Sequence, residues 1–546
     1  MRDKLIQKFI VKDTIKSIDD VKISLSEMFY YLFWIIMLFA KGTGLYEGMR
    51  QYNICLVLAM LCLGLKLLFT KYKVADFVWM IPLVLFGGWI YLHSKDQSAF
   101  ILVAVMIGLK EIQLPRVFKI GALTLGGCFV YMILRTFAGG STGPILAHEK
   151  LGLGPVLRWS LGYTHPNVLH ITYVVLAAFI LYLWNLKPGK KQWKITMWLM
   201  LGNIYIFLYS ISFTGFLLMT LLLILNLYLM GRRRVSKMER MALQCILPVC
   251  IAFSLVVPMI LDSDGRLFQM INHALNNRYS ATRIYIQELG LSLWGVKVPS
   301  LYGFAIDCSY TGALLSYGSV FFVALIIGYM FTIHHMVKKE LWKELAIMLS
   351  LLVAGVSEPF LFNASFKNIT VLFIGAYLFE IVGYLSETTK VSFLRKEILL
   401  FSGKDKEISL KVGNIRNICN EIMVSVCNNK GKLICISFLA FLICAGAGAK
   451  FAYRPDSIYI GVGSTDCGKR EEKYLNMQEL EEGFNSLVYE YPGKERPMYE
   501  FSGNMLALEY MRKIISCGVW GGGTVTLLVF TGLTAAGYYS KRERKG

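Results

Sequence analysis

Charged residues are scarce in this chain of 546 residues. Only 17% are Asp, Glu, Lys or Arg, whereas 55% are hydrophobic and the mean hydropathy is +0.53. Soluble proteins carry about 25% charged residues. The composition therefore excludes an ordinary soluble domain and predicts an integral membrane protein.

The sequence also lacks the motifs of several common sites. Its 12 cysteines form no CxxC pair and no zinc-type spacing, and most fall within apolar stretches, which indicates small buried side chains. No glycine-rich strand–turn–helix motif is present, which argues against a cytosolic transferase that uses nucleotide sugars. The first 25 residues are charged, so we expect no cleavable signal peptide.

The net charge of +21 has the sign of a nucleic-acid-binding protein, but the basic residues lie in short loops between apolar stretches. That is the positive-inside pattern of membrane proteins, so we expect no nucleic acid among the partners. Residues 1–25 interleave basic and apolar side chains, which predicts a cytoplasmic arm lying on anionic membrane lipids.

Apolar stretches close to the ~20 residues that a bilayer requires recur along the whole chain. They fall near residues 26–41, 52–71, 76–93, 98–112, 117–138, 166–185, 195–211, 213–230, 241–261, 311–333, 344–362, 368–385, 433–451 and 514–537. With the basic links placed inside, they predict an all-α polytopic protein with about 14 transmembrane helices and both termini in the cytoplasm.

This topology divides the chain into four parts. They are a basic arm (1–25), a transmembrane core of about 12 helices (26–385), a cytoplasmic linker (386–432) and a C-terminal module (433–546). The module contains a helix, an external segment (452–513), a second helix and a basic tail.

Two external loops of the core are long, at residues 139–165 and 262–310, whereas most other loops are short. A transporter usually shows repeated halves and interrupted helices, and neither is evident in this sequence. Long external loops on a scaffold of many helices favour an enzyme that acts at the outer membrane surface.

The first long loop ends in His165-Pro166-Asn167, seven residues after Arg158. Proline in the first helical turn costs no hydrogen bond, so the next helix is expected to start here. The corner would hold Arg158 and His165 at the membrane surface. A plain interfacial anchor, with Arg158 snorkelling and His165 capping the helix, is the alternative.

The second long loop carries Arg278 and Arg283, against the usual charge bias of external loops. They are either contacts to lipid headgroups or, with Arg158, part of an external arginine cluster. The forked guanidinium group matches phosphate oxygens in a bidentate way, so such a cluster suits a lipid-linked pyrophosphate.

Four groups of residues carry a family resemblance. They are Arg158…Gly162-Tyr-Thr-His165-Pro166-Asn167; Asn277-Arg278 with Leu293-Trp-Gly295; Ile306-Asp307-Cys308-Ser309-Tyr310 with Tyr317-Gly318; and Glu358-Pro359…Asn363…Asn368. In order and spacing they resemble Wzy-type polysaccharide polymerases and O-antigen ligases, and they are most similar to the repeat-unit polymerases of Gram-positive capsules and exopolysaccharides. The resemblance covers roughly residues 20–385, and Cys308 replaces an asparagine that is usual in the family.

The resemblance implies a glycosyltransferase of the bacterial cytoplasmic membrane. A glycan carried on polyprenyl pyrophosphate is moved, at the outer face, onto the sugar of another lipid-linked repeat unit. Arginines neutralise the pyrophosphate leaving group without a metal or a cofactor. Membrane lipids, a chain-length regulator and a flippase of the same pathway are further expected partners.

The resemblance also suggests roles for individual residues. Arg158 and Arg278 are expected to bind the pyrophosphate, with Arg283 in a secondary role. Asp307 is the preferred general base and His165 the second candidate. The residues expected to contact the sugars are Glu358, Asn167 and Tyr310. The structural alternatives are a helix cap for Asp307, a loop-fixing hydrogen bond for His165 and an ion pair of Glu358 with Lys367.

Other functions stay open at this stage. A ligase that transfers the glycan to a different acceptor shares all these motifs, and a polysaccharide flippase or transporter is the alternative that is not an enzyme. Asp262-Ser-Asp264 has the DxD pattern of metal-using transferases, although the two aspartates can also mark a helix end. The C-terminal module has the helix–segment–helix plan of chain-length regulators but lacks their proline-rich second helix, so its role is open.

Overall fold

The computed structural model describes residues 20–137, 145–150, 154–186, 191–232, 235–299, 301, 306–363, 365–389, 391–399, 407–411, 413–451, 458–461, 488–491, 494–501 and 504–543. The chain divides into two compact units. Unit 1 comprises Met1–Ile23, Pro144–Trp159 and Ile408–Gly546, and unit 2 comprises Ser24–Gly143 and Ser160–Glu407. Most of the basic arm expected over residues 1–25 lies outside the described residues.

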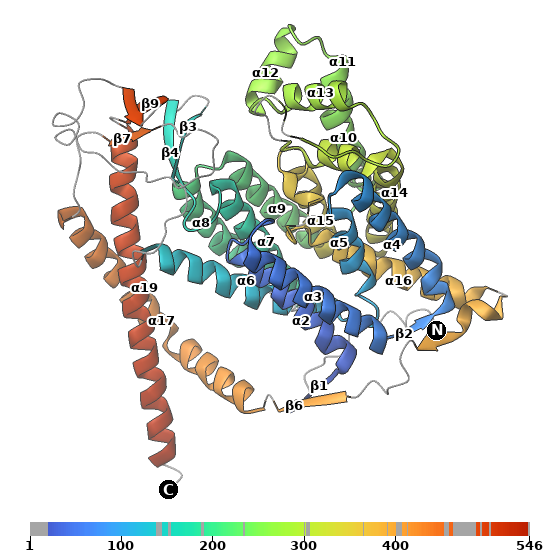
Figure 1. The fold of residues 1–546 in the computed structure, drawn as a ribbon. Helices are drawn as coiled ribbons and strands as arrows, with labels where there is room; N and C mark the ends of the chain where they lie inside the picture. The colour runs from blue at the N-terminus through green and yellow to red at the C-terminus, as the bar shows by residue number, and fades with distance from the viewer. Residues whose placement is uncertain are drawn as a thin grey trace. The chain divides into compact units, whose positions relative to one another are not determined.

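Unit 2 is helical almost throughout its described part (Figure 1). Its α-helices are α2 (Leu25–Gly42), α3 (Arg50–Phe69), α4 (Val74–Ser94), α5 (Ser98–Ile107), α6 (Leu114–Phe137), α7 (Pro166–Asn185), α8 (Gln192–Ser210), α9 (Phe213–Gly231), α10 (Lys237–Ile251), α11 (Val257–Ile260), α12 (Arg266–Ala274), α13 (Arg278–Leu289), α14 (Ser309–Lys339), α15 (Trp342–Ala354) and α16 (Thr370–Thr388). A π-helical turn, η1 (Ala252–Val256), joins α10 to α11, and η2 (Pro359–Leu361) and η3 (Ser392–Arg395) are 3₁₀ turns. The short strands β2 (Lys71–Lys73) and β5 (Glu397–Leu399) pair antiparallel.

Unit 1 contains two long helices, α17 (Gly413–Phe451) and α19 (Asn504–Glu543), and several short strands. The strands are β1 (Asp20–Ser24), which pairs with β6 (Glu407–Lys411); the hairpin β3 (Ile145–Lys150) and β4 (Gly154–Trp159); and β7 (Ile458–Gly461), β8 (Val488–Tyr491) and β9 (Lys494–Phe501), in the order β7-β9-β8. Glycines bring the two helices together, because a side chain on Gly518 or Gly521 would overlap Phe441 or Cys444 of α17.

The chain is a multi-pass α-helical membrane protein. In the part of the chain that the structure describes, eleven helices are long and apolar enough to cross a membrane. Three further stretches expected to span correspond to α5, α8 and α15. Helices α5 and α15 have only 10 and 13 residues, or about 15 and 20 Å, against a hydrocarbon layer of about 30 Å.

Helices α5, α7 and α15 form the core of unit 2. All residues of α5 except Phe100 are buried, and α15 packs against α7 and α9. Within the core, His170 of α7 bonds through Nδ1 to Ser210 (3.0 Å) and through Nε2 to Asn203 of α8 (2.7 Å). These contacts fix α7, whose first turn carries the His-Pro-Asn corner.

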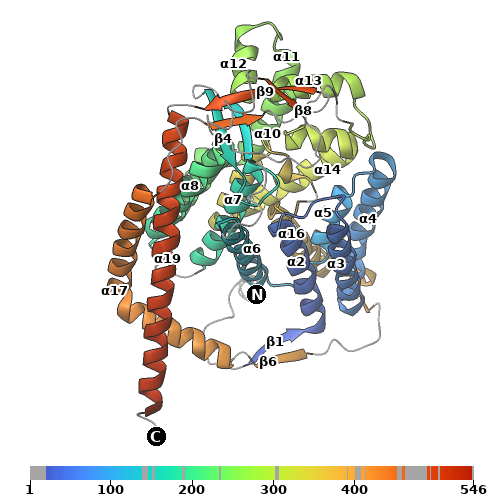
Figure 2. The same cartoon turned by 60° about the vertical axis from the view of Figure 1, so that its left-hand side comes forward.

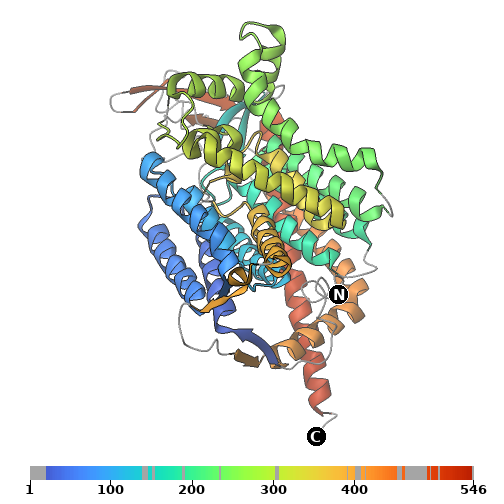
Figure 3. The ribbon, with the colours of Figure 1, turned by 90° about the vertical axis from the view of Figure 1, so that its right-hand side faces the viewer.

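The loops expected at 139–165 and 262–310 contain secondary structure. The first includes the β3–β4 hairpin, and the second includes α12 and α13, which lie together at one end of unit 2 (Figure 1, Figure 2 and Figure 3). Helix α17 begins within the expected linker, and α19 begins within the expected external segment. Long apolar stretches reveal membrane spans, but short polar helices and strands leave no such signal.

Candidate functional site

The His-Pro-Asn corner starts α7 as expected. His165 is the residue before the helix, and its Nδ1 accepts a hydrogen bond from the Asn167 backbone amide (3.1 Å), with Pro166 in the first turn. Gly162 precedes the corner with φ +87°, and a Cβ atom added at this position would crowd Thr136 and Met132. Because Nδ1 accepts, the neutral imidazole carries its proton on Nε2.

Residues 355–369, between α15 and α16, are attached to the first turn of α7. The Asn167 side-chain amide donates to the Glu358 carboxylate (3.2 Å), and the Lys367 ammonium donates to the Val168 carbonyl (3.3 Å). Glu358 and Lys367 are only 5% and 9% exposed. Two ionisable side chains are therefore buried beside the corner that the sequence singled out.

The start of α14 is attached to the same segment. The Ser309 amide donates to the Gly355 carbonyl (2.8 Å), and the Ser309 hydroxyl donates to the Glu358 carbonyl (2.5 Å) and accepts from the Leu361 amide (3.1 Å). Asp307 is two residues before Ser309. The structure thus brings residues 165–167 of the first motif group and 307–310 of the third to one segment, which also carries Glu358 of the fourth.

Arg278 occupies the first position of α13 and points to Asp307. Its Nη1 donates to the Leu275 carbonyl (2.7 Å), and its Nη2 lies 3.4 Å from Oδ2 of Asp307. The side chain is 11% exposed, and its Nε–H is buried without a hydrogen-bond partner among the described residues. Two left-handed residues, Asn276 and Asn277, form the turn that places Arg278 there.

Burial shifts the pKa values of two groups at this site, and neighbouring charges modify the shifts. Partial burial raises the pKa of the Asp307 carboxyl above its ordinary value, and the Arg278 guanidinium opposes that rise. Burial lowers the pKa of Lys367 to about 7; the Glu358 carboxylate opposes this effect and Lys41 adds to it. A partly exposed carboxylate beside a guanidinium, and an amine that titrates near neutral pH, are suited to acid–base chemistry.

The guanidinium group of Arg283 has a different set of partners from that of Arg278. Its Nε donates to the Pro258 carbonyl (3.1 Å), its Nη2 donates to the Leu261 carbonyl, and its guanidinium stacks over Phe268 at 5.0 Å. These contacts hold α13 against α11 and α12. We therefore assign Arg283 to the packing of this end of unit 2 rather than to pyrophosphate binding.

Tyr310 is also a packing residue. It is fully buried, and its hydroxyl donates to the Leu352 carbonyl of α15 (2.7 Å). A hydroxyl occupied inside the protein has no surface to offer a sugar, so we assign Tyr310 to the attachment of α14 to α15.

Residues 292–296 lie against residues 315–320 of α14. There the helix is interrupted at Gly318, which has φ +78° and ψ 162°. The Val296 amide donates to the Leu315 carbonyl and the Ser319 amide to the Ser292 carbonyl, both at 2.9 Å. The sequence singled out Gly295 and Gly318 separately, and the fold makes them neighbours.

Arg158 belongs to unit 1. It lies in β4, opposite Leu146 of β3, and its side chain is 4% exposed. The neighbouring residues of β4 bond to α19: the Trp159 Nε1–H donates to Glu509 (3.2 Å), and Arg512 donates to the Leu157 carbonyl (3.0 Å). The expected core and the C-terminal module are therefore divided differently from the sequence-based boundaries, because the hairpin belongs with the module.

The DxD pair lies in a turn between α11 and α12. Oδ1 of Asp262 accepts from the Asp264 amide (3.2 Å), and both aspartates are exposed. Among the described residues, no group of three or more His, Cys, Asp and Glu side chains is arranged to hold a metal ion.

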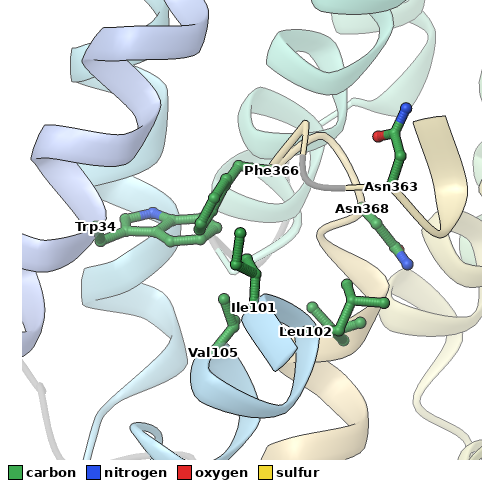
Figure 4. A pocket seen from close by; sticks show the side chains of 8 residues that line it. Trp34, Ile101, Leu102, Val105, Asn363, Phe366 and Asn368 are labelled. Carbon is green, nitrogen blue, oxygen red and sulfur yellow. The ribbon is translucent and has the colours of Figure 1, made fainter. Parts of the chain in front are cut away.

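A small cavity lies beside the segment 355–369 (Figure 4). It is lined by Trp34, Ile101, Leu102, Val105, Asn363, Phe366, Asn368 and Val371. Its volume of about 10 Å³ admits about one water molecule and no sugar. Figure 4 shows the Phe366 ring next to Trp34, so this part of the segment is anchored in the core.

The sequence singled out Arg278, Asp307, His165, Asn167 and Glu358, and the structure gathers them around residues 355–369 and the start of α14 in unit 2. Lys367 was considered only as an ion-pair partner, and its burial has no signal in the sequence.

A comparison of the chain with protein-family models, curated proteins and solved structures finds no match.

Proposed function

We propose that this membrane protein is a glycosyltransferase that polymerises polyprenyl-pyrophosphate-linked oligosaccharide repeat units at the outer face of the bacterial cytoplasmic membrane. In this proposal about 14 helices cross or enter the membrane, and both termini are cytoplasmic. The proposal rests on the resemblance of the four motif groups and on the chemistry of the residues around Arg278.

The observation that carries the proposal is the geometry of Arg278. Arg278 is the first residue of helix α13. Leu275 and Asp307 fix the orientation of the group, and its buried Nε–H has no hydrogen-bond partner among the described residues. An unused, oriented donor on a cation is suited to a phosphate oxygen.

The reaction balances without a redox step. The acceptor hydroxyl oxygen attacks the anomeric carbon of the donor glycan, the new C–O bond forms, and the bond from that carbon to the pyrophosphate oxygen breaks. The hydroxyl proton passes to a base, and the polyprenyl pyrophosphate leaves with the bonding electrons. Arg278 neutralises the charge that develops on the leaving group.

Asp307 is the base that fits this step. Its carboxylate keeps 41% of its side-chain surface exposed, and Arg278 orients it. His165 fits a different role, because its Nδ1 already accepts a hydrogen bond from the Asn167 backbone amide. We assign His165 and Asn167 to the corner that positions Glu358 and the sugar.

The test is rescue of a strain that lacks the gene, with glycan length and lipid-linked repeat units scored at matched protein levels. Wild type should restore long chains, whereas Arg278→Ala and Asp307→Asn should leave single repeat units outside the cell. Arg266→Ala is the matched control, because Arg266 is an exposed arginine at the start of α12 in the same segment.

The outcomes separate the possible functions. Normal chains from Arg278→Ala would remove the pyrophosphate role. Repeat units trapped inside the deletion strain would identify a flippase or another transporter. Full-length glycan that accumulates on its lipid, unattached to its final acceptor, would identify a ligase.

A further inference from the structure

The chain that follows α13 exposes large apolar side chains within a loop, at residues 291–294, which we call the wedge. Leu291, Leu293 and Trp294 are 64%, 59% and 39% exposed. Charged residues flank them, because Glu288 precedes the wedge and Lys297 follows it, and both are exposed. Contiguous apolar groups on a protein surface mark a contact with a membrane or with another protein.

The wedge lies on α4. The Trp294 ring packs beside Phe86 (6.0 Å between ring centroids) and meets Trp89 edge-on (6.3 Å). Trp89 itself is 48% exposed, and Leu85 and Leu92 of the same helix are 67% and 60% exposed. Because α4 is long and apolar enough to cross a membrane, its exposed apolar face is covered by lipid. The wedge therefore continues a surface that faces the hydrocarbon of the bilayer.

Two helices indicate how deep the wedge lies, since the positive-inside rule predicts that their lysine-bearing ends are cytoplasmic. Trp89 follows Lys73, the cap of α4, by 16 positions. Gly318 precedes Lys338 of α14 by 20 positions, and Gly318 contacts Gly295, the residue after the wedge. At a rise of about 1.5 Å per residue, these separations are about 24 and 30 Å. The hydrocarbon layer is about 30 Å thick, so the wedge lies at its outer boundary, where tryptophan is enriched.

The wedge is bonded to α14, the helix that begins two residues after Asp307. The Ser319 amide donates to the Ser292 carbonyl (2.9 Å), just past the break of α14 at Gly318. Along the chain the wedge also lies between Arg278 and Asp307, whose side chains meet at 3.4 Å. The depth of the wedge in the bilayer therefore sets the depth of these two groups.

We propose that the wedge inserts into the outer leaflet of the membrane and holds the Arg278–Asp307 pair at the level of the lipid headgroups. The acyl chains of membrane lipids cover its exposed surface, because α4 presents the adjoining surface to them. The exposed Glu288 and Lys297 stay on the polar side of the boundary. The role in depth rests on the proposed function, in which a lipid-linked pyrophosphate then meets Arg278 without leaving the headgroup layer.

The first experiment tests insertion without any assay of function. The full chain is reconstituted into vesicles of phosphatidylethanolamine and phosphatidylglycerol alone, so that only lipid can cover the wedge. Leu293→Cys should react with a water-soluble maleimide at least about tenfold more slowly than Lys297→Cys, because a thiol in hydrocarbon is neither ionised nor in contact with the reagent. Both positions are exposed in the protein itself, so burial by the fold cannot produce this difference. The wild-type chain gives the background from the native cysteines.

The second experiment tests the effect of depth on the reaction. Leu293→Asp places a charge in the wedge, which disfavours its insertion into hydrocarbon. Transfer from a long-chain lipid-linked repeat unit in the same vesicles should fall about tenfold or more, because a small displacement of the reacting groups is costly. Transfer from a water-soluble analogue with a shortened polyprenyl chain should change less than about twofold, because this donor reaches the site from water. Lys297→Asp is the control, since position 297 lies outside the hydrocarbon.

The outcomes separate the inference from the proposed function. Slow labelling of Leu293→Cys, with a loss confined to the long-chain donor in Leu293→Asp, supports the inference. Equal labelling of Leu293→Cys and Lys297→Cys would overturn the insertion, whatever the protein does. Equal losses on the two donors would overturn the role in depth, because general damage to the fold acts on both. If Arg278→Ala leaves glycan length normal in the deletion strain, the function fails, and slow labelling of Leu293→Cys would still support the insertion.

Discussion

Gly295 and Gly318 touch through their main chains. A Cβ atom on Gly318 would lie 2.4 Å from the amide nitrogen of Gly295, and one on Gly295 would lie 2.1 Å from the carbonyl oxygen of Ser316. Both glycines have positive φ values, +87° and +78°. The contact fixes the chain that follows α13 against the interrupted α14, so that the segment between Arg278 and Asp307 is held near its middle.

Gly318→Ala is expected to destabilise the protein by more than about 2 kcal/mol, because it adds backbone strain to a steric overlap. The amount of protein in the membrane and its melting temperature in detergent would both fall. Gly328→Ala is the matched control, since a side chain at Gly328 of the same helix would meet nothing within 4 Å. Equal behaviour of the two variants would contradict the close contact.

The rate of polymerisation is expected to fall as the external pH is lowered. The base must be deprotonated, and the pKa of Asp307 is raised by partial burial against the opposing effect of Arg278. The loss should therefore begin above the ordinary aspartate value of about 3.9. Asp307→Glu should keep an acid limb, Asp307→Asn should lose about 100-fold in rate, and the exposed Asp264→Asn should behave as wild type. Full activity of Asp307→Asn would exclude this base.

Arg283→Ala is expected to lower protein stability rather than the turnover of each molecule. It leaves the Pro258 and Leu261 carbonyls without their donor, at a cost of about 1–3 kcal/mol. The measurement is glycan per protein molecule alongside melting temperature. A variant with normal stability and no activity would return Arg283 to the pyrophosphate site.

Stability is expected to rise with pH above about 7 because of Lys367. Its pKa in the folded protein is about 7, below that of an unfolded lysine, so the unfolded chain binds more protons between these values. The contribution is lost as the pH falls from the unfolded value to about 7, and below about 7 both states are protonated and this pH dependence ends. Between these values the free energy of unfolding should rise by about 1.4 kcal/mol per pH unit.

Lys367→Met should flatten this part of the curve of melting temperature against pH. Lys297→Met is the matched control, because Lys297 is exposed. A curve that is equally steep in wild type and in Lys367→Met would show that Lys367 is charged in the folded state throughout this pH range.

The sequence predicted Arg278 and Asp307 as site residues because both stand in motif groups outside the apolar spans, and their catalytic roles stay predictions. Their contact at 3.4 Å was not readable, since 29 residues and a helix separate them. Arg283 shows the limit of residue type as a guide. The same side chain, five positions along the helix from Arg278, is committed to the carbonyls of Pro258 and Leu261.

The sequence by itself determined the membrane class and the start of α7, because apolar length and a proline in the first turn act locally along the chain. Tertiary structure alone decided which charged groups are buried, which arginine keeps a donor unused, and that β4 lies against α19. Those properties depend on groups far apart in the chain coming together, and desolvation acts only where the fold has removed water.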